Sequence, residues 1–504
     1  MKKQNSYIYS YIVFFFILIV PIFLNYTDLW DGTFYQYAQL VNEFDGAKLG
    51  LYQSGWRLNY WLIFFIIKIS NFINIDYFFA YIILLSLFYL LFLMEVELFV
   101  FKNKLVNDNN IKYVLFLICC SSSQSFFYSS IMLWPVVCLY CAFIGVRLFI
   151  SEKNIYNFLS LLPLIVAFSY KSFLLFIPCL AFFYLKNNFK PKLFFLFLIG
   201  CVIFFIFHFY FVNFGKMENY AQIIIPRSIN EFLYLLRTAL TYSTYFIPLF
   251  IISLLVFFYA KLKKTHSKFL VFLFDFFKNK TKEILFLLSA IIPYVAIGRS
   301  SVIWDVDDWT GRVMILFTIP VSVISVQMLE IFFKKNLINK KIFHLSFIFL
   351  LLVNLCFLFK GSIVKINRII YQKKLSIIIK NYQNEIKNLN GIFLINDSYI
   401  IKPIFRINES NFLTYLSIGK NYLWTEINSN KDIKKQLENI QKNPQHFNEY
   451  KNYYISNLVT DKPICFILLK IQSSNFEGLK NKIKNLINNN NGKISVQNFE
   501  KNCS

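Results

Sequence analysis

The run Phe78-Phe-Ala-Tyr-Ile-Ile-Leu-Leu-Ser-Leu-Phe-Tyr-Leu-Leu-Phe-Leu-Met94 contains no charged side chain. The apolar stretch continues to about residue 101, so it reaches the roughly 20 residues that a helix needs to cross a bilayer. Similar runs recur along the chain, and their apolar residues are consecutive. Strands of a transmembrane β-barrel would alternate between apolar and polar positions. The sequence therefore predicts an α-helical polytopic membrane protein.

The composition of the whole chain agrees with this prediction. Of its 504 residues, 57% are hydrophobic and only 16% are charged, whereas globular chains are about 45–50% apolar and about 25% charged. The 52 basic and 27 acidic residues give a net charge of +25. In a membrane protein such an excess is expected in cytoplasmic loops, so we predict lipid contacts and no nucleic-acid partner. The nine Cys and four His form no metal-binding motif, and no cofactor is predicted.

The apolar runs predict about eleven spans. A first run, 9–24, follows Met1-Lys2-Lys3 and lacks a small-residue cleavage site, so it is expected to be a span with its N-terminus inside. The later runs are 78–101, 113–130, 131–150, 155–169, 172–185, 192–213, 243–260, 283–298, 313–333 and 343–360. The pair 155–169 and 172–185 is short and is expected to form a hairpin that does not fully cross.

Loop charge sets the predicted orientation. Lys-rich loops lie at 102–104, 186–192, 261–282 and 334–341, and strict alternation from the first span places all four in the cytoplasm. The apolar stretch 56–69 would invert every later loop if it were a full span. We therefore expect it to be re-entrant or paired with another half-span.

A change of composition near residue 361 predicts two domains. Residues 1–360 hold the spans, whereas residues 361–504 are rich in Asn and Lys and contain no run of span length. The segments 391–396 and 463–469 are typical of buried strands, and 374–389 and 476–487 of helices. The sequence predicts a small α/β domain outside the cytoplasm, where Cys465 and Cys503 would face an oxidising space. A disulfide between them is one alternative, and a core-strand position for Cys465 is the other.

The predicted external loops collect acids, Trp and Arg. Asp28 and Asp31 stand just past the first span with a spacing that can place both on one helical face. A carboxylate at the membrane surface can deprotonate a sugar hydroxyl, and helix capping is the alternative role. Lys171 is the only charged residue between Lys153 and Lys186. It can hold a lipid phosphate or extend its ammonium group to the headgroups.

The predicted external loop Gly298–Arg312 is a further candidate site. Its Arg299 and Arg312 side chains suit phosphate, and its Trp side chains suit sugar rings. Asp307 and Asp308 belong to an acid cluster of the kind that binds cations, so a divalent cation stays open, and a solvated loop with internal ion pairs is the alternative. Arg57, beside the first loop, is a further candidate for phosphate.

The order of these features resembles the GT-C superfamily of integral-membrane glycosyltransferases, nearest the protein O-mannosyltransferase and aminoarabinose-transferase type. Asp31 takes the family's leading acidic position, followed by Tyr35 and Ala38, and Tyr170-Lys171-Ser172 resembles its Lys-Gly motif. Gly32 stands where the family has a second acid, and Met132-Leu-Trp-Pro135 where it has Arg-Pro-Asp.

The resemblance implies transfer of a sugar from a polyprenyl-phosphate donor to a cell-envelope glycan, lipid or protein outside the cytoplasmic membrane, as in polysaccharide biosynthesis. Asp31 would be the general base with Asp28 in support. Lys171, Arg57 and Arg312 would hold the donor phosphate, and Tyr35, Arg299, Asp307 and Asp308 would contact substrate. An O-antigen or capsule polymerase and a lipid-linked glycan flippase or transporter are the alternatives. A transporter would be expected to show internal repeats or paired broken helices.

Overall fold

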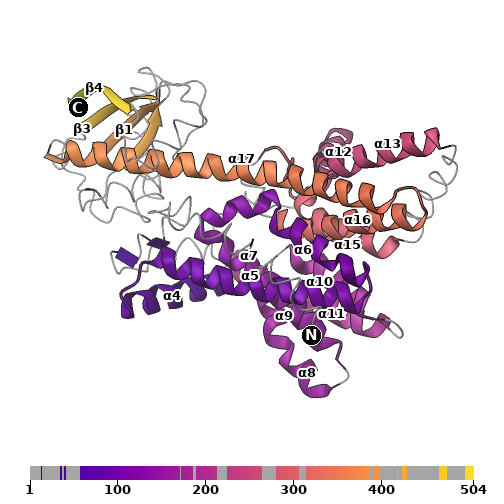
Figure 1. The fold of residues 1–504 in the computed structure, drawn as a ribbon. Helices are drawn as coiled ribbons and strands as arrows, with labels where there is room; N and C mark the ends of the chain where they lie inside the picture. The colour runs from indigo at the N-terminus through magenta and orange to yellow at the C-terminus, as the bar shows by residue number, and fades with distance from the viewer. Residues whose placement is uncertain are drawn as a thin grey trace. The chain divides into compact units, whose positions relative to one another are not determined.

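The computed structural model describes most of the apolar region and four strands of the tail (Figure 1). The described residues are 57–151, 153–170, 172–185, 189–212, 224–263, 280–305, 314–384, 391–396, 423–427, 465–473 and 494–503, with the single positions 13, 35, 36, 39, 40 and 417. The chain divides into two compact units. Unit 1 comprises residues 1–23, 52–59 and 79–364, and unit 2 comprises residues 24–51, 60–78 and 365–504.

Helices dominate the described residues before the tail. The α-helices are α4 (Arg57–Phe72), α5 (Tyr77–Lys102), α6 (Ile111–Cys119), α7 (Leu133–Phe149), α8 (Asn154–Leu159), α9 (Leu161–Phe168), α10 (Phe173–Tyr184), α11 (Phe189–Val212), α12 (Ile229–Tyr242), α13 (Ile247–Leu262), α15 (Thr281–Ala296), α16 (Met314–Lys334) and α17 (Lys340–Asn381). Short 3-10 segments are η1 (Asp108–Asn110), η2 (Ser122–Tyr128), η3 (Ser130–Met132) and η4 (Ser243–Phe246).

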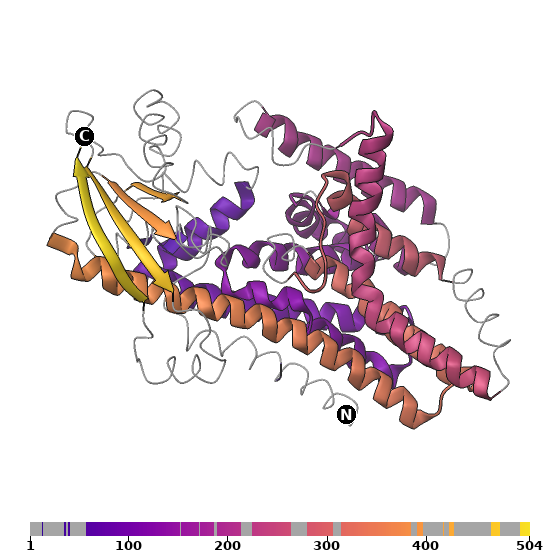
Figure 2. The ribbon, with the colours of Figure 1, turned by 90° about the horizontal axis from the view of Figure 1, so that it is seen from above.

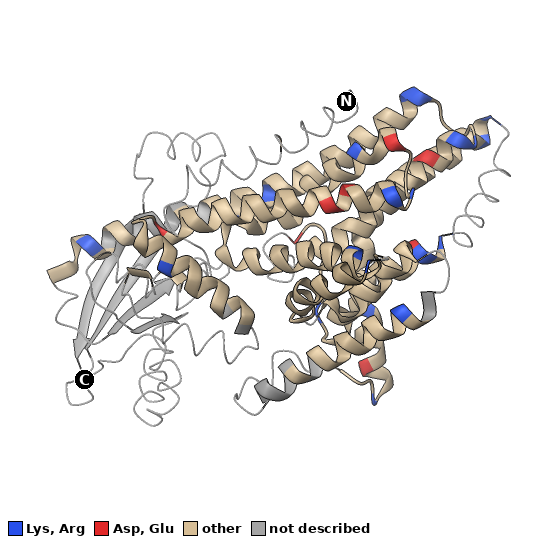
Figure 3. Cartoon of the chain, turned by 90° about the horizontal axis from the view of Figure 1, so that it is seen from below, with Lys and Arg blue, Asp and Glu red and all other residues tan. Residues whose placement is uncertain are grey.

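Five helical stretches in the described part of the chain are long and apolar enough to cross a bilayer. They are Tyr77–Lys102, Ser130–Phe149, Ile229–Leu262, Met314–Lys334 and Lys340–Ile366. Each contains most or all of one predicted run, although Ile229–Leu262 begins 14 residues before the predicted run 243–260. A helical membrane protein is supported, and the number of spans stays a prediction. Figure 3 shows the same pattern, because the long helices are mostly tan and few blue or red positions interrupt them. The predicted first span, 9–24, lies outside the described residues except for helical Val13.

An aromatic cluster forms the core of unit 1. Phe99 of α5 lies with its ring centroid 5.4 Å from that of Phe143 on α7 and 5.9 Å from that of Phe286 on α15. The Phe286 ring also packs against Phe176 and Phe183 of α10, at 4.8 and 5.5 Å. These edge and tilted contacts add to the burial of large apolar surfaces. One cluster therefore joins four helices that are far apart in sequence.

Polar contacts sort the helix ends of unit 1 into two groups. At the first end, Arg147 near the end of α7 pairs with Glu95 of α5, and Gln327 of α16 reaches Leu105 just after α5. Lys102, Lys104, Lys334, Lys335, Lys340 and Lys341 lie in or beside the connections at this end, which we call the basic end. The predicted Lys-rich loops 102–104 and 334–341 therefore share one end, as the predicted alternation requires.

Tyrosines mark the opposite end. Tyr81, four residues into α5, donates to the carbonyls of Phe127 and Ser129, at 3.1 and 2.8 Å. Tyr242, at the end of α12, donates to the Arg299 carbonyl at 2.6 Å. Helix α17 begins at the basic end with Lys340. Lys360, 20 residues later, donates to the Trp304 carbonyl at 2.8 Å. We call this group of helix ends and loops the tyrosine end.

The predicted span 113–130 is wrong as a continuous helix. The α-helix α6 ends at Cys119, and two 3-10 segments follow before α7. Ser side chains compete for backbone hydrogen bonds, which disfavours a helix interior; Ser125, for example, donates to the Ser122 carbonyl at 2.8 Å. All residues from Ser121 to Met132 are buried, and irregular backbone at membrane depth is tolerated when protein covers it.

The tail holds a four-stranded mixed sheet with the order β2-β1-β3-β4 (Figure 2). Its strands are β1 (Gly391–Asn396), β2 (Leu423–Ile427), β3 (Cys465–Ser473) and β4 (Ile494–Cys503). Strand β1 is parallel to β2 and β3, and β4 is antiparallel to β3. The predicted strand 391–396 is confirmed, and that at 463–469 begins two residues later and extends to Ser473. The register pairs Cys465 with Cys503.

Helix α17 corrects the predicted start of the tail. We expected a separate helix at 374–389, but α17 runs without a break from Lys340 to Asn381, because no Pro or Gly-rich turn interrupts it near residue 374. The predicted domain boundary at residue 361 falls inside this helix, and the division between the two compact units falls four residues later, between Val364 and Lys365. The predicted helix 476–487 lies outside the described residues.

Candidate functional site

The structure describes only part of the predicted site. Of the nine candidate residues, Tyr35 and Arg299 have described side chains, and Arg57 is described as the first residue of α4 without its side chain. The other six lie outside the described residues: Asp28, Asp31, Lys171, Asp307, Asp308 and Arg312. Their roles stay predictions, and the described segments beside some of them supply the geometry that follows.

In unit 2, the helical residues that follow Asp31 dock onto the start of α5. Gln39 binds the backbone on both sides of Asp76, because its amide donates to the Ile75 carbonyl at 2.8 Å and accepts from the Tyr77 amide at 2.6 Å. The Tyr35 ring lies 6.0 Å from that of Tyr77 in an edge arrangement, and Tyr35 is 3% exposed. Tyr35 is therefore part of the packing that joins the first loop to α5.

Asp76 is an acid of this region that the sequence analysis did not single out. Its carboxylate accepts from the Phe78 amide at 2.8 Å, as an N-cap of α5 does, and from the Gln36 side chain at 3.2 Å. Asp76 is exposed, so it adds a solvent-facing carboxylate beside the helical residues of the first loop. An Asp directly before a long apolar run is a helix-start signal, and that signal could have identified it.

In unit 1, hydroxyl groups of α12 and η4 hold the loop that carries Arg299. Tyr234 donates to the Gly298 carbonyl at 2.9 Å, and Thr241 and Thr244 accept from the amides of Ser301 and Ile303, both at 3.1 Å. Gly298 has φ +69°, and a Cβ there would lie 2.9–3.0 Å from Ile224 and Tyr234. A residue with a side chain would be strained at this position, so the sequence fixes the turn into the loop.

The anchored loop presents Arg299 at the tyrosine end. The backbone of Arg299 is held on both sides, since its amide donates to the Tyr294 carbonyl at 2.9 Å and its carbonyl accepts from Tyr242 at 2.6 Å. Its guanidinium group is partly exposed and forms no ion pair or hydrogen bond within the described residues. A fixed backbone with an uncompensated guanidinium is an arrangement that suits an anionic group.

The described neighbours of Lys171 lie at the same end of unit 1 as the loop that follows α15. Lys282 of α15 lies 4.6 Å above the ring of Phe182 near the end of α10, and Phe286, one turn later, reaches back to Phe176. Helices α10 and α15 are therefore antiparallel, so the start of α10 at Phe173 shares an end with the loop that follows α15. Tyr170 and Ser172, the two described neighbours of Lys171, flank that start.

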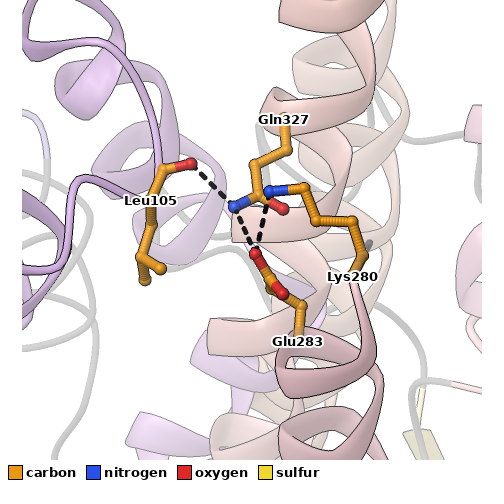
Figure 4. A network of polar contacts seen from close by, with 4 residues as sticks. All are labelled: Leu105, Lys280, Glu283 and Gln327. Carbon is orange, nitrogen blue, oxygen red and sulfur yellow. Dashed lines mark hydrogen bonds and ion pairs between the residues drawn. The ribbon is translucent and has the colours of Figure 1, made fainter. Parts of the chain in front are cut away.

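A buried polar network lies at the basic end (Figure 4). The carboxylate of Glu283 accepts from Lys280 and from Gln327, both at 2.9 Å, and Gln327 also donates to the Leu105 carbonyl at 2.7 Å. One turn after Gln327, Glu330 accepts from the Asn107 amide and from the Asn110 side chain, both at 2.7 Å. These contacts clamp the loop after α5 onto α15 and α16. No site residue was predicted here.

A second ion pair at the basic end joins α5 to α7. Arg147 donates to both oxygens of Glu95, at 2.9 and 2.7 Å, which is the two-point geometry that Arg and carboxylate favour. The Glu95 side chain is 8% exposed and that of Arg147 29%. Sequence analysis assigned these residues no role, and their full mutual pairing agrees with a structural one.

No group of three or more His, Cys, Asp or Glu side chains among the described residues is arranged to hold a metal ion. The predicted acid pair Asp307 and Asp308 lies outside the described residues. Comparison of the chain with family models, with curated proteins and with solved structures finds no match.

Proposed function

We propose that this protein is a membrane glycosyltransferase that moves a sugar from a polyprenyl-phosphate donor to a cell-envelope glycan, lipid or protein. One observation carries the proposal. The loop with Arg299, which forms no ion pair with the described residues, and the two described neighbours of Lys171 lie at the same end of unit 1. The described residues on either side of Lys171 thus share an end with Arg299, and a phosphate-bearing substrate requires cations in such a place.

In the proposed reaction, the Asp31 carboxylate removes the proton of an acceptor hydroxyl. The acceptor oxygen attacks the anomeric carbon from the side opposite the phosphate, which inverts the configuration. The bond between the anomeric carbon and the phosphate oxygen breaks, and polyprenyl phosphate leaves with the electron pair. Lys171, Arg57 and Arg312 stabilise its negative charge, as cations do for a leaving phosphate. Arg299, Asp307 and Asp308 complete the substrate side, with Asp28 supporting the base, whereas the buried Tyr35 supports the packing of the first loop.

The proposal includes a topology in the cytoplasmic membrane. It comprises about eleven spans, a re-entrant stretch at 56–69, a transmembrane domain that ends within α17 and an α/β domain outside the cytoplasm. Its support is the alternation of Lys-rich loops together with the separation of the basic end from the tyrosine end. In this topology Asp31, Lys171 and Arg299 all lie outside the cytoplasm.

The test is a transfer reaction with the purified full chain in liposomes. Polyprenyl-phosphate sugars of defined composition serve as donors, and release of polyprenyl phosphate is measured with and without an envelope glycan acceptor. Acceptor-dependent release that requires Asp31 is the expected result. Release without Asp31, or none with any donor that the host synthesises, would contradict the assignment.

One observation favours a second function, that of a flippase for a lipid-linked glycan. The buried interruption between Cys119 and Leu133 breaks the path from α6 to α7, and broken helices are typical of transporter binding sites. Movement of a labelled lipid-linked glycan across the liposome bilayer, without any transfer, would favour this function.

A further inference from the structure

Helix α12 exposes an apolar face and buries two hydroxyl-bearing side chains on its other side. Ile229, Phe232, Leu233, Leu236 and Leu240 are 46–75% exposed and recur at three- and four-residue intervals, so they form one face. On the other side, Thr238 and Tyr242 are 3% and 1% exposed. A helix on the surface of a soluble protein has the opposite arrangement, so this apolar face requires an apolar surrounding.

The apolar segment that contains α12 is too long for a single span, so α12 is distinct from the span that follows it. The stretch Ile229–Leu262 has 34 residues, which is about 51 Å at 1.5 Å per residue and exceeds the roughly 30 Å of a hydrocarbon core. The 3-10 segment Ser243–Phe246 and α13 together already supply about 20 residues for a crossing. Helix α12 is therefore left for the membrane interface, where amphipathic helices bury one face among lipid chains.

One flank of this helix carries Arg237 and contacts the loop that carries Arg299. Tyr234, Arg237 and Thr241 follow an i, i+3, i+7 spacing and so share a side of α12. Tyr234 and Thr241 are also the residues that hold Gly298 and Ser301, on either side of Arg299 in the anchored loop. Arg237 is therefore next to the part of the loop that carries Arg299.

Neither cation is neutralised by the described residues. The side chains of Arg237 and Arg299 form no ion pair there, and the nearest acid on the helix, Glu231, accepts instead from the Arg227 amide at 2.6 Å. Ser228 accepts from the Glu231 amide at 3.2 Å, so it caps the start of α12, and Glu231 binds the amide before the cap. The Asp305 carboxylate, six residues after Arg299, makes no ion pair with either of them.

We propose that α12 and the loop from Gly298 to Asp305 form a binding site for an anionic membrane phospholipid. The acyl chains cover the exposed apolar face of α12, and the phosphate group lies between Arg237 and Arg299. The charge of the two guanidinium groups complements the phosphodiester, and the exposed Phe and Leu side chains complement its chains. The bound lipid would stabilise the loop that presents Arg299, independently of any sugar transfer.

The test measures lipid binding to the detergent-solubilised full chain by native mass spectrometry, without donor or acceptor. Phosphatidylglycerol and phosphatidylcholine with the same acyl chains are titrated separately. We expect wild type to bind phosphatidylglycerol more tightly. Arg237→Gln should weaken that binding about ten- to a hundredfold, the range for a charge-assisted hydrogen bond, with phosphatidylcholine binding unchanged. Arg299→Gln should act in the same direction.

The matched control is Arg227→Gln, which removes the same charge beside the same helix but off the flank of Tyr234 and Thr241. It should change the affinity for phosphatidylglycerol less than about twofold, since it leaves the two-cation site intact. Equal affinity of wild type for the two lipids, or an equal loss in the control, would overturn the proposal. The effect of Arg237→Gln separates this site from the donor site, because Arg237 has no part in the proposed reaction. Because no transfer is measured, this result is distinguishable from a failure of the proposed reaction.

Discussion

Gln327 of α16 donates a hydrogen bond of 2.9 Å to the carboxylate of Glu283 on α15, and both side chains are buried. The same amide nitrogen donates to the Leu105 carbonyl at 2.7 Å. A single amide thus connects two helices and the loop after α5. The carboxylate also receives Lys280 at 2.9 Å, so Lys280 compensates its charge and Gln327 supplies a second hydrogen-bond donor.

The substitution Gln327→Leu leaves the net charge unchanged and should therefore lower the stability of the protein. The substitution leaves the Leu105 carbonyl unpaired and removes one of two donors from the Glu283 carboxylate, and each loss is worth about 1–3 kcal/mol when the group is buried. The measurement is the thermal unfolding midpoint in detergent. The matched control is Asn354→Leu on α17, whose side chain donates only within its own helix, to Leu350 at 3.0 Å. A midpoint as high as that of the control would show that the network contributes little.

The ion pair between Glu95 and Arg147 predicts a rescue. Arg147→Met alone should lower stability by about 1–3 kcal/mol, because it leaves a largely buried carboxylate without its partner; the partial exposure of Arg147 keeps the loss below the 3–5 kcal/mol of a fully buried pair. Adding Glu95→Gln removes the uncompensated charge and should restore most of the loss. Unfolding midpoints of the two single variants and the double variant give the coupling. Additive losses would argue against a direct pair.

Asp31 is predicted to be the catalytic base. Asp31→Asn keeps the shape of the side chain but cannot accept a proton, and loss of a general base costs about 10²- to 10⁴-fold in rate. A helix cap would cost only about 1 kcal/mol of stability and would leave turnover intact. Transfer activity in membranes, normalised to folded protein, is measured for Asp31→Asn beside Asp28→Asn. If the second variant alone is inactive, the base is Asp28.

Lys171 is predicted to bind the donor rather than take part in proton transfer. Lys171→Met should raise the donor concentration needed for half-maximal rate about ten- to a hundredfold, because a charge-assisted contact is worth about 1.5–3 kcal/mol. The control is Lys153→Met, an exposed lysine whose ammonium lies 5.5 Å above the Tyr156 ring. Unchanged donor dependence in the Lys171 variant would leave it the role of a headgroup anchor.

The tail is predicted to lie outside the cytoplasm. A reporter that is active only outside should be active when it is fused after Ser504, because one span follows the Lys-rich loop 334–341 in the proposed topology. A second readout comes from the sheet, whose register pairs Cys465 with Cys503. In an oxidising compartment we expect a disulfide between them, detected as a linked peptide by mass spectrometry before reduction. Reporter activity restricted to the cytoplasm would reverse the topology.

The sequence by itself determined which segments are apolar helices. Runs such as 78–101 and 313–333 have few polar side chains over a span's length, and helix formation satisfies their backbone groups locally. Local capping also follows from sequence, as at Ser228 and Glu231, since these contacts join residues three or four apart. The strand at 391–396 was predicted for a similar reason, because a short apolar run between polar segments is typical of a buried strand.

Tertiary structure alone decided what depends on residues far apart in the chain. The pairing of Gln327 with Leu105 spans 222 positions, and the anchoring of the Arg299 loop by Tyr242 spans 57; no local pattern encodes either partner. The break after Cys119 was missed because hydropathy averages over side chains, whereas Ser side chains act through individual hydrogen bonds to the backbone. The outward apolar face of α12 could be read as a periodic pattern, but only packing shows that its polar side faces the protein. Burial and long-range hydrogen bonds thus decide which of several locally allowed arrangements the chain adopts.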